Sequence, residues 1–275
     1  MVEIEVTLRD GTPEDARGLL VPIPFDSWHQ TYLGCELEGA EIAATVQATN
    51  SGQSCYWVED FSPSDFRLVY RFERTPASPP AWLWDLPGHP FAASPDLQEQ
   101  AREITAASGD PIRSLVDHAI GHFDYGHPER SILADRDTVP AVCDLTEGSC
   151  VDIHTWFISA LRACGGEATY LHGYYFRDGE TSPGFHCWLA TRDGSDIADW
   201  DLSHALIFDE KPARPGFDAY PGERVVIGAG KDLEFDLEGM PVRCHILCHP
   251  TFVGAEGEAA RSAVRVRQLD PAPTD

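Results

Sequence analysis

The chain has 275 residues, 43% of them hydrophobic, which is enough for one large domain or two modest domains with a core. Its formal net charge of −25 argues against nucleic acid or an anionic membrane as a partner, because both would repel it. No apolar run is long enough to cross a bilayer, and the N-terminus lacks the basic and apolar regions of a signal peptide, so we expect a cytoplasmic protein.

The first 75 residues are predicted to form β structure. Alternating or apolar runs separated by turn residues predict strands at 2–8, 19–25, 41–49, 54–58 and 66–74. Several short strands without helices indicate a β-sandwich-like N-terminal domain over residues 1–75. A proline-rich connector follows at 76–95, and its Trp82 and Trp84 predict that it lies across the surface of the core domain that follows rather than hanging free.

Two helices are expected next. Asp96 is placed to cap a helix over 97–107, and Asp110-Pro111 begins a second helix over 112–123. His118 and His122 share one face of the second helix, as zinc ligands can. The metalloprotease zinc motif needs a glutamate where this chain has Ala119, so no metal is predicted here.

A third helix carries the first candidate for chemistry. Apolar residues at helical spacing predict a helix over 151–164, ended by two glycines, with Ser149 as its N-cap. Cys150 then lies in the first turn, where the helix dipole and the unpaired N–H groups favour a thiolate. The same N–H groups can stabilise an oxyanion on an attacked carbonyl.

Three β-like runs follow the helix, at 167–176, 185–190 and 195–201. His186 opens the second run and Asp201 ends the third. A nucleophile at a helix N-terminus, with its base and orienting carboxylate on adjacent strands, is the arrangement of a catalytic triad for acyl transfer. The sequence therefore indicates Cys150, His186 and Asp201 as one catalytic unit.

Three alternatives to this unit stay open. His154 lies four residues after Cys150 on the same helix and can compete with His186 as the base. Asp199 faces the same side of an extended strand as Asp201 and can replace it. Cys143 is close enough in the chain to form a regulatory disulfide with Cys150.

The last part of the chain predicts two strands around Glu238-Gly239. Alternation along the second strand places Cys244 and Cys248 on one face and His245 and His249 on the other, which argues against a tetrahedral metal site. Residues 254–275 are expected to form a partly ordered C-terminal tail.

Four segments together resemble the core of the transglutaminase-like superfamily. They are G-S-C at a helix start, A-L-R-A-C-G-G-E-A-T-Y-L-H-G-Y, F-H-C-W and W-D-L-S-H-A, within residues 97–205. The resemblance implies an α+β fold with a papain/transglutaminase-like core over 96–253, in which the cysteine helix packs on an antiparallel sheet. The V-P-I-P-F-D-S-W-H-Q segment is similar to a strand ahead of the core in bacterial members.

The family's cysteine, histidine and aspartate fall on Cys150, His186 and Asp201, and an aromatic residue of the family falls on Tyr125, beside the active site. One departure is Leu202, where a proline or small residue normally follows the aspartate.

The resemblance implies a cysteine hydrolase, peptidase or acyltransferase that forms a thioester on Cys150 from a peptide, isopeptide or glutamine-type amide. Hydrolysis is expected to dominate over transfer to an amine co-substrate, because water at about 55 M needs no binding site. No cofactor is expected, since the sequence has no D-x-D-x-D-G calcium loop. The alternative is a non-catalytic binding or assembly module that retains the fold.

Overall fold

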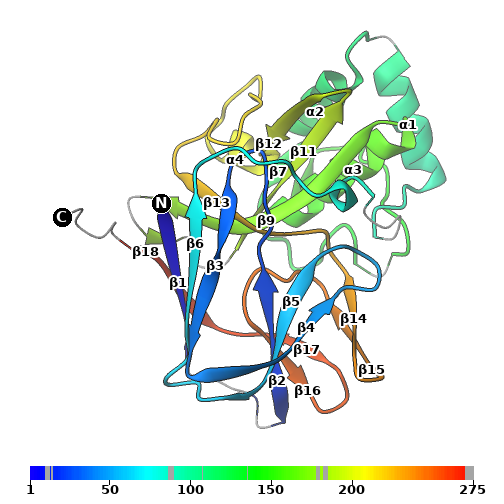
Figure 1. The fold of residues 1–275 in the computed structure, drawn as a ribbon. Coiled ribbons are helices and arrows are strands. Elements are labelled where there is room, and N and C mark those ends of the chain that lie inside the picture. The colour runs from blue at the N-terminus through cyan, green and yellow to red at the C-terminus, as the bar shows by residue number, and fades with distance from the viewer. Residues whose placement is uncertain are drawn as a thin grey trace. The chain divides into compact units, whose positions relative to one another are not determined.

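Figure 1 shows the computed structural model, which describes residues 1–9, 13, 15–85, 90–106, 108–134, 136–177, 180–181 and 185–269. Residue contacts divide the chain into two compact units. The first comprises Met1–Asp85, His172–His186 and Gly222–Asp275, and the second comprises Leu86–Leu171 and Cys187–Pro221. The units thus interleave along the chain, whereas the domain ranges expected from the sequence are consecutive; those ranges stay a prediction.

The first unit contains two antiparallel sheets. One includes, in this order, β10 (Glu180–Thr181), β18 (Val264–Leu269), β1 (Val2–Leu8), β6 (Arg67–Glu73) and β3 (Thr31–Glu38), and β10 also pairs with β9 (Glu167–Arg177). The other has the order β17 (Ala259–Arg261), β16 (Thr251–Gly254), β2 (Ala16–Ile23), β5 (Ser54–Phe61) and β4 (Ala40–Gln47). This confirms a β-rich N-terminal region whose strands form two sheets.

Both sheets also contain C-terminal strands, β18 in the first and β16 and β17 in the second, whereas β14 (Leu233–Leu237) and β15 (Met240–Cys244) form a separate sheet. The hairpin of β14 and β15 buries every second residue, as in Leu233, Phe235 and Leu237. These side chains pack with Leu20 and Trp57 in one apolar core cluster. The core of this unit is therefore built by residues that are about 200 positions apart in sequence.

The expectation of a partly ordered tail was wrong for residues up to Leu269. β18 pairs with β1 along its whole length, and the pair Val6 and Val266 is buried. Non-local pairing supplies the hydrogen bonds and burial that this short segment cannot obtain alone. Residues 270–275 lie outside the described part of the chain.

The expected strand through Cys248 was also wrong, because β15 ends at Cys244 and the chain turns before β16 begins at Thr251. Alternation does not continue across this turn, because Cys248 and His249 are both buried. His245 is exposed, and its Nδ1 lies 2.8 Å from Oδ1 of Asp232. A further strand, β3, was missed since a glycine interrupts its T-Y-L-G-C-E-L-E sequence and breaks the alternation that would have marked a strand.

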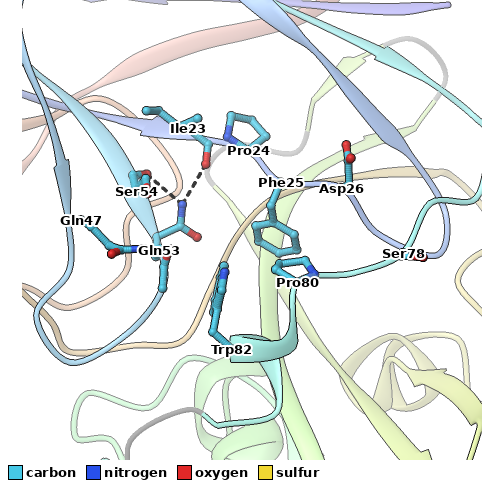
Figure 2. A pocket seen from close by; sticks show the side chains of 11 residues that line it. Ile23, Pro24, Phe25, Asp26, Gln47, Gln53, Ser54, Ser78, Pro80 and Trp82 are labelled. Atoms are coloured by element: carbon cyan, nitrogen blue, oxygen red, sulfur yellow. Dashed lines mark hydrogen bonds between the residues drawn. The ribbon is translucent and has the colours of Figure 1, made fainter.

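A pocket of about 380 Å³ lies in the first unit, where the connector meets the β4–β5 hairpin (Figure 2). Its floor is rigid, because the buried amide of Gln53 donates to the carbonyl oxygens of Ile23 and Ser54 at 2.9 and 3.0 Å. Trp82 forms one wall and packs so closely on Gly52 that a Cβ there would lie 2.1 Å from its Cγ. Trp82 thus packs the connector on the N-terminal β structure of the first unit, whereas its sequence predicted a position on the surface of the catalytic core.

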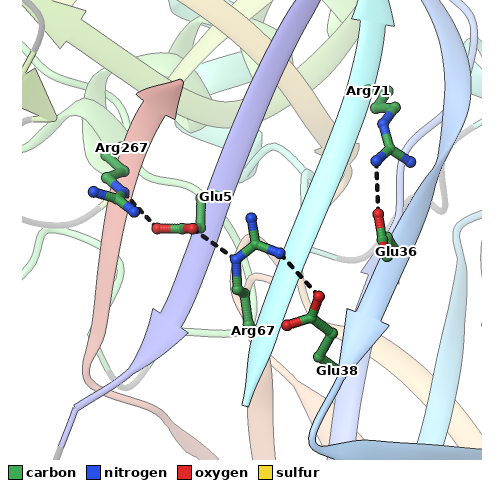
Figure 3. Close-up of polar contacts among 6 residues, drawn as sticks. All are labelled: Glu5, Glu36, Glu38, Arg67, Arg71 and Arg267. Carbon is green, nitrogen blue, oxygen red and sulfur yellow. Dashed lines mark hydrogen bonds and ion pairs between the residues drawn. The ribbon is translucent and has the colours of Figure 1, made fainter. Parts of the chain in front are cut away.

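Ion pairs cross the strands of the first sheet (Figure 3). Glu5 on β1 is only 6% exposed, and its carboxylate accepts from Nε of Arg67 at 2.8 Å and from Nε of Arg267. Arg67 also forms an ion pair with Glu38, with its Nη1 3.1 Å from Oε1 of Glu38. The hydrogen bonds from Arg267, followed by those from Arg67, lower the pKa of Glu5.

Replacing Glu5 by glutamine is expected to lower the free energy of unfolding at neutral pH by about 1 to 3 kcal/mol, since two arginines lose their buried anion. The pKa of Glu5 is lower in the folded state, so its contribution is present above the unfolded carboxyl pKa of about 4.3 and is lost as pH falls further. Urea unfolding at pH 7 and pH 3 measures both effects. Glu38→Gln is the control: its side chain is 52% exposed, so it should change stability little, and equal losses for both variants would contradict the assignment.

The second unit holds the four α-helices of the described residues. They are α1 (Pro95–Ala106), α2 (Pro111–His122), α3 (Cys150–Ala163) and α4 (Leu202–Ile207). Two short parallel strands, β7 (Phe123–Tyr125) and β8 (Thr146–Gly148), precede α3, and β11 (His186–Asp193) pairs with β12 (Asp196–Trp200). β9 (Glu167–Arg177) begins in this unit, and β13 (Glu223–Ala229) and the 3₁₀ helix η1 (Ala81–Leu83) belong to the first unit.

Helix α3 is the centre of the second unit, because nearly all its residues from Cys150 to Leu161 are buried. The start of α1 differs from the expectation: Ser94, rather than Asp96, caps it, and its Oγ accepts from the backbone N–H of Leu97 at 3.2 Å. Asp110 caps α2 as expected. Among the described residues, no helix combines the length and apolar character that a membrane span requires.

Candidate active site

Cys150 is the first residue of α3, and the turn before it is fixed by a capping box. The Ser149 side chain accepts from the N–H of Asp152 at 3.4 Å, and the Asp152 carboxylate accepts from the N–H of Ser149 at 2.9 Å. The other oxygen of Asp152 accepts from the hydroxyl of Ser131. The predicted N-cap and the placement of Cys150 in the first turn are both confirmed.

The thiol of Cys150 is buried, with 7% exposed, at the positive end of a helix of 14 residues. Cys187 on β11 is completely buried, and its side chain lies within interaction range of that of Cys150. Burial, followed by this contact, raises the pKa of the Cys187 thiol well above its usual value. Cys187 is therefore a neutral thiol next to the candidate nucleophile.

Tyr125 is placed by the parallel pairing of β7 and β8, which sets it opposite Gly148, two residues before Cys150. Burial raises the pKa of Tyr125 to about 12, and the charges of Cys150, Cys187 and Asp201 act in the same direction. Tyr125 thus lies near Cys150, as the resemblance implied, and it carries its phenolic proton at neutral pH.

Asp201 ends the β11–β12 hairpin and caps α4. Its carboxylate is almost fully buried, with 3% exposed. One oxygen accepts from the hydroxyl of Ser203 at 2.9 Å and from the N–H of His204 at 3.0 Å. The other oxygen lies 2.7 Å from Nδ1 of His204. A buried anion is stabilised by such donors.

The competing carboxylate, Asp199, is also buried and lies within β12, opposite Ala190. Asp201 is the aspartate whose charge reaches both Cys187 and Tyr125, the two neighbours of Cys150. This observation favours Asp201, whose role as the orienting carboxylate stays a prediction.

The competing histidine, His154, is completely buried one turn along α3. Its Nε2 accepts a hydrogen bond of 3.0 Å from the backbone N–H of Leu202, so the ring proton of the neutral form is on Nδ1, which lies 3.8 Å from the sulfur of Cys187. Both ring nitrogens thus contact the protein. The arrangement ties α3 to the turn that holds Asp201, which is a structural role.

His186 begins β11 and is 7% exposed. It is the last residue of the His172–His186 segment of the first unit. In that unit, its ring centre lies 5.8 Å from the ring centre of Tyr175. The guanidinium of Arg224 lies over this same Tyr175 ring, 5.3 Å from its centre. Cys150 and Asp201 belong to the second unit, and the assignment of His186 as their base stays a prediction.

The histidines of α2 have another arrangement. The rings of His118 and His122 stack with their centres 3.9 Å apart, and His118 also stacks on Trp156. The ring nitrogens turn toward backbone oxygens, His118 Nε2 toward Val142 at 3.3 Å. Cys143 is exposed and receives a contact of 3.5 Å from the amide of Gln100.

Two residues of the site were missed by sequence reasoning. From the sequence alone Cys187 is only a small apolar residue of a β-like run, and its place beside Cys150 depends on how β11 meets α3. His204 had a local signal, because an N-cap aspartate can meet the side chain three residues later in the first helical turn. The D-L-S-H segment contains this spacing, but it was used only for the resemblance.

Comparisons with known proteins give one family. The model of the transglutaminase-like superfamily matches residues 97–199. Among curated proteins, no relative matches. Similar solved structures include a candidate cysteine protease from Cytophaga hutchinsonii, at 13% identity and a TM-score of 0.48, covering 99% of this chain and 92% of that chain. The periplasmic domain of TgpA from Pseudomonas aeruginosa gives 18% identity and a TM-score of 0.40, covering 76% and 90%.

Proposed function

We propose that the chain is a cysteine-dependent acyl-transfer enzyme acting on peptide or protein amides, because its residues 97–199 match the transglutaminase-like superfamily. The observation that carries the proposal is the position of Cys150. A buried thiol is held at the N-terminus of a long helix by a capping box, beside the neutral thiol of Cys187, whose pKa the charge of Asp201 also raises.

The reaction would begin with the Cys150 thiolate and a protonated His186. The sulfur attacks the amide carbonyl, and first-turn N–H groups of α3 stabilise the resulting oxyanion. When the tetrahedral intermediate collapses, the C–N bond breaks and the leaving amine takes the proton of His186. The products of this half are a Cys150 thioester, a free amine and a neutral imidazole.

In the second half, water attacks the thioester while His186 accepts its proton. The C–S bond breaks, the acid leaves, and the thiolate–imidazolium pair is restored. Asp201 would hold the imidazole in the tautomer that both halves need. An amine in place of water would give an acyl transfer, and we propose water as the main acceptor because it needs no binding site.

Alkylation by iodoacetamide as a function of pH tests the proposal without a known substrate. Cys150 is expected to react fast at pH 6, at least about tenfold faster than the exposed Cys143, since a paired thiolate persists below the ordinary thiol pKa. Peptide mapping by mass spectrometry gives the rate for each thiol.

His186→Ala should abolish the reactivity of Cys150 at pH 6. The matched control is His245→Ala, which removes an imidazole whose side chain is 57% exposed, and it should leave the rate unchanged. A wild-type Cys150 that reacts no faster than Cys143 would leave a binding or assembly module as the better account of the protein. A fast Cys150 that ignores His186→Ala would instead identify another base.

A further inference from the structure

The carboxylate of Asp201 has an imidazole partner inside its own unit. His204 lies one turn into α4, with 7% of its side chain exposed, and its Nδ1 is 2.7 Å from an Asp201 oxygen. A carboxylate can only accept, so Nδ1 carries the proton and donates. This hydrogen bond is shorter than the contacts from the Ser203 hydroxyl and from the His204 backbone N–H.

The ring of His204 is held in this position by its surroundings. It packs on Phe208, with ring centres 5.5 Å apart, and Phe208 in turn stacks on Tyr220. The backbone N–H of Phe208 donates to the carbonyl oxygen of His204 at 2.9 Å, so the aromatic ring is fixed to the same helical turn. The Nδ1 donor is thus preorganised toward Asp201.

We propose that His204 is a positioning residue of the cysteine site, which acts through Asp201 and not on the substrate. The inference rests on the proposed function. His204 would fix the carboxylate by its second oxygen and keep it in the anionic form. The main-chain and hydroxyl donors hold the first oxygen, so the two oxygens together leave the carboxylate one orientation.

A change at Asp201 acts on more groups than His204 alone, because other titratable side chains lie around the Asp201 carboxylate. The titratable groups that meet the Asp201 carboxylate or the residues packed on it come from β7, α3, β11 and the segment after α4. Among the described residues of the second unit, they are Tyr125, Cys150, His154, Cys187 and Tyr220. Burial raises the pKa of Tyr125, of Cys187 and of Tyr220, and the charge of Asp201 acts in the same direction on all three, so a change in its protonation is felt next to Cys150.

Loss of the His204 donor should make the carboxylate easier to protonate, because a hydrogen bond to the charged form stabilises that form. A protonated Asp201 would support an imidazolium less well, and the thiolate pair would form only at higher pH. A residue that serves only to pack α4 would instead change stability without moving the pH at which Cys150 becomes reactive.

The test compares His204→Ala with His204→Asn, using the pH profile of Cys150 alkylation by iodoacetamide and the melting temperature. The asparagine amide can place an N–H near the position of Nδ1, whereas alanine cannot. We expect His204→Ala to slow the alkylation of Cys150 about tenfold at pH 6 and to shift its pH profile to higher pH. His204→Asn should keep most of the wild-type rate. In an Asp201→Asn background, His204→Ala should add little.

Several outcomes separate the two proposals. If wild-type Cys150 is fast at pH 6 and His204→Ala lowers the melting temperature without moving the profile, His204 only packs the helix and the inference is wrong. If His204→Ala and His204→Asn slow the alkylation of Cys150 equally, the Nδ1 donor is not what supports its reactivity. The same conclusion follows if the effects of Asp201→Asn and His204→Ala multiply. If wild-type Cys150 is itself slow at pH 6, the proposed function fails first.

Discussion

Replacing Cys150 by serine is expected to remove acyl-enzyme formation and to lower kcat/KM for an activated ester by about 10⁴-fold or more. The hydroxyl has nearly the volume of the thiol, but the helix N-terminus cannot ionise an alcohol as it can a thiol. The measurement uses p-nitrophenyl acetate, which needs little specific recognition. Release of nitrophenolate gives the rate, and intact mass shows whether an acetyl group is attached to the protein.

The controls for this variant are Cys143→Ser and Cys164→Ser, which remove thiols that are exposed and half-buried. Both should keep the wild-type burst of nitrophenolate and the acetylated mass. Cys150→Ser should also unfold at the wild-type temperature, because Ser149 and Asp152 cap α3 through their own side chains. A serine variant that still forms the acetylated protein at the wild-type rate would show that another residue is the nucleophile.

The largest expected effect on stability belongs to Gly173→Ala. Gly173 lies in the part of β9 that belongs to the first unit, and a Cβ at this position would be 1.8 Å from the carbonyl oxygen of Val225 on β13. It would also be 2.9 Å from the Val225 carbonyl carbon. Backbone atoms of a buried strand cannot turn aside as a side chain can, so the two strands must separate.

We expect Gly173→Ala to lower the free energy of unfolding by about 3 kcal/mol or more, measured by urea unfolding. The matched control is Gly121→Ala, since a Cβ on Gly121 of α2 meets nothing within 4 Å. That substitution should stabilise the protein by about 0.5 to 1 kcal/mol, because alanine loses less entropy in a helix. Equal stability of Gly173→Ala and the wild type would contradict the close approach of β9 and β13.

Local sequence signals predicted the elements that local forces determine. The alternating V-E-I-E-V-T-L run predicted β1, and Ser149 ahead of apolar residues at helical spacing predicted the capped start of α3. The same signals failed where the strand gains its order from a distant partner, as in β3 and β18. They also gave the wrong cap for α1, because Ser94 and Asp96 are both capping residues and only the backbone path chooses between them.

The sequence itself determined two properties of the candidate site. Capping and periodicity fix the place of Cys150 in a helical first turn, and residues 97–199 match the transglutaminase-like superfamily. The tertiary structure decided which groups surround Cys150 and Asp201. The contact of Cys187 with Cys150 and the anchoring of Leu202 by His154 join residues more than 30 positions apart. Such contacts depend on how a strand packs against a helix, and no local propensity encodes that packing.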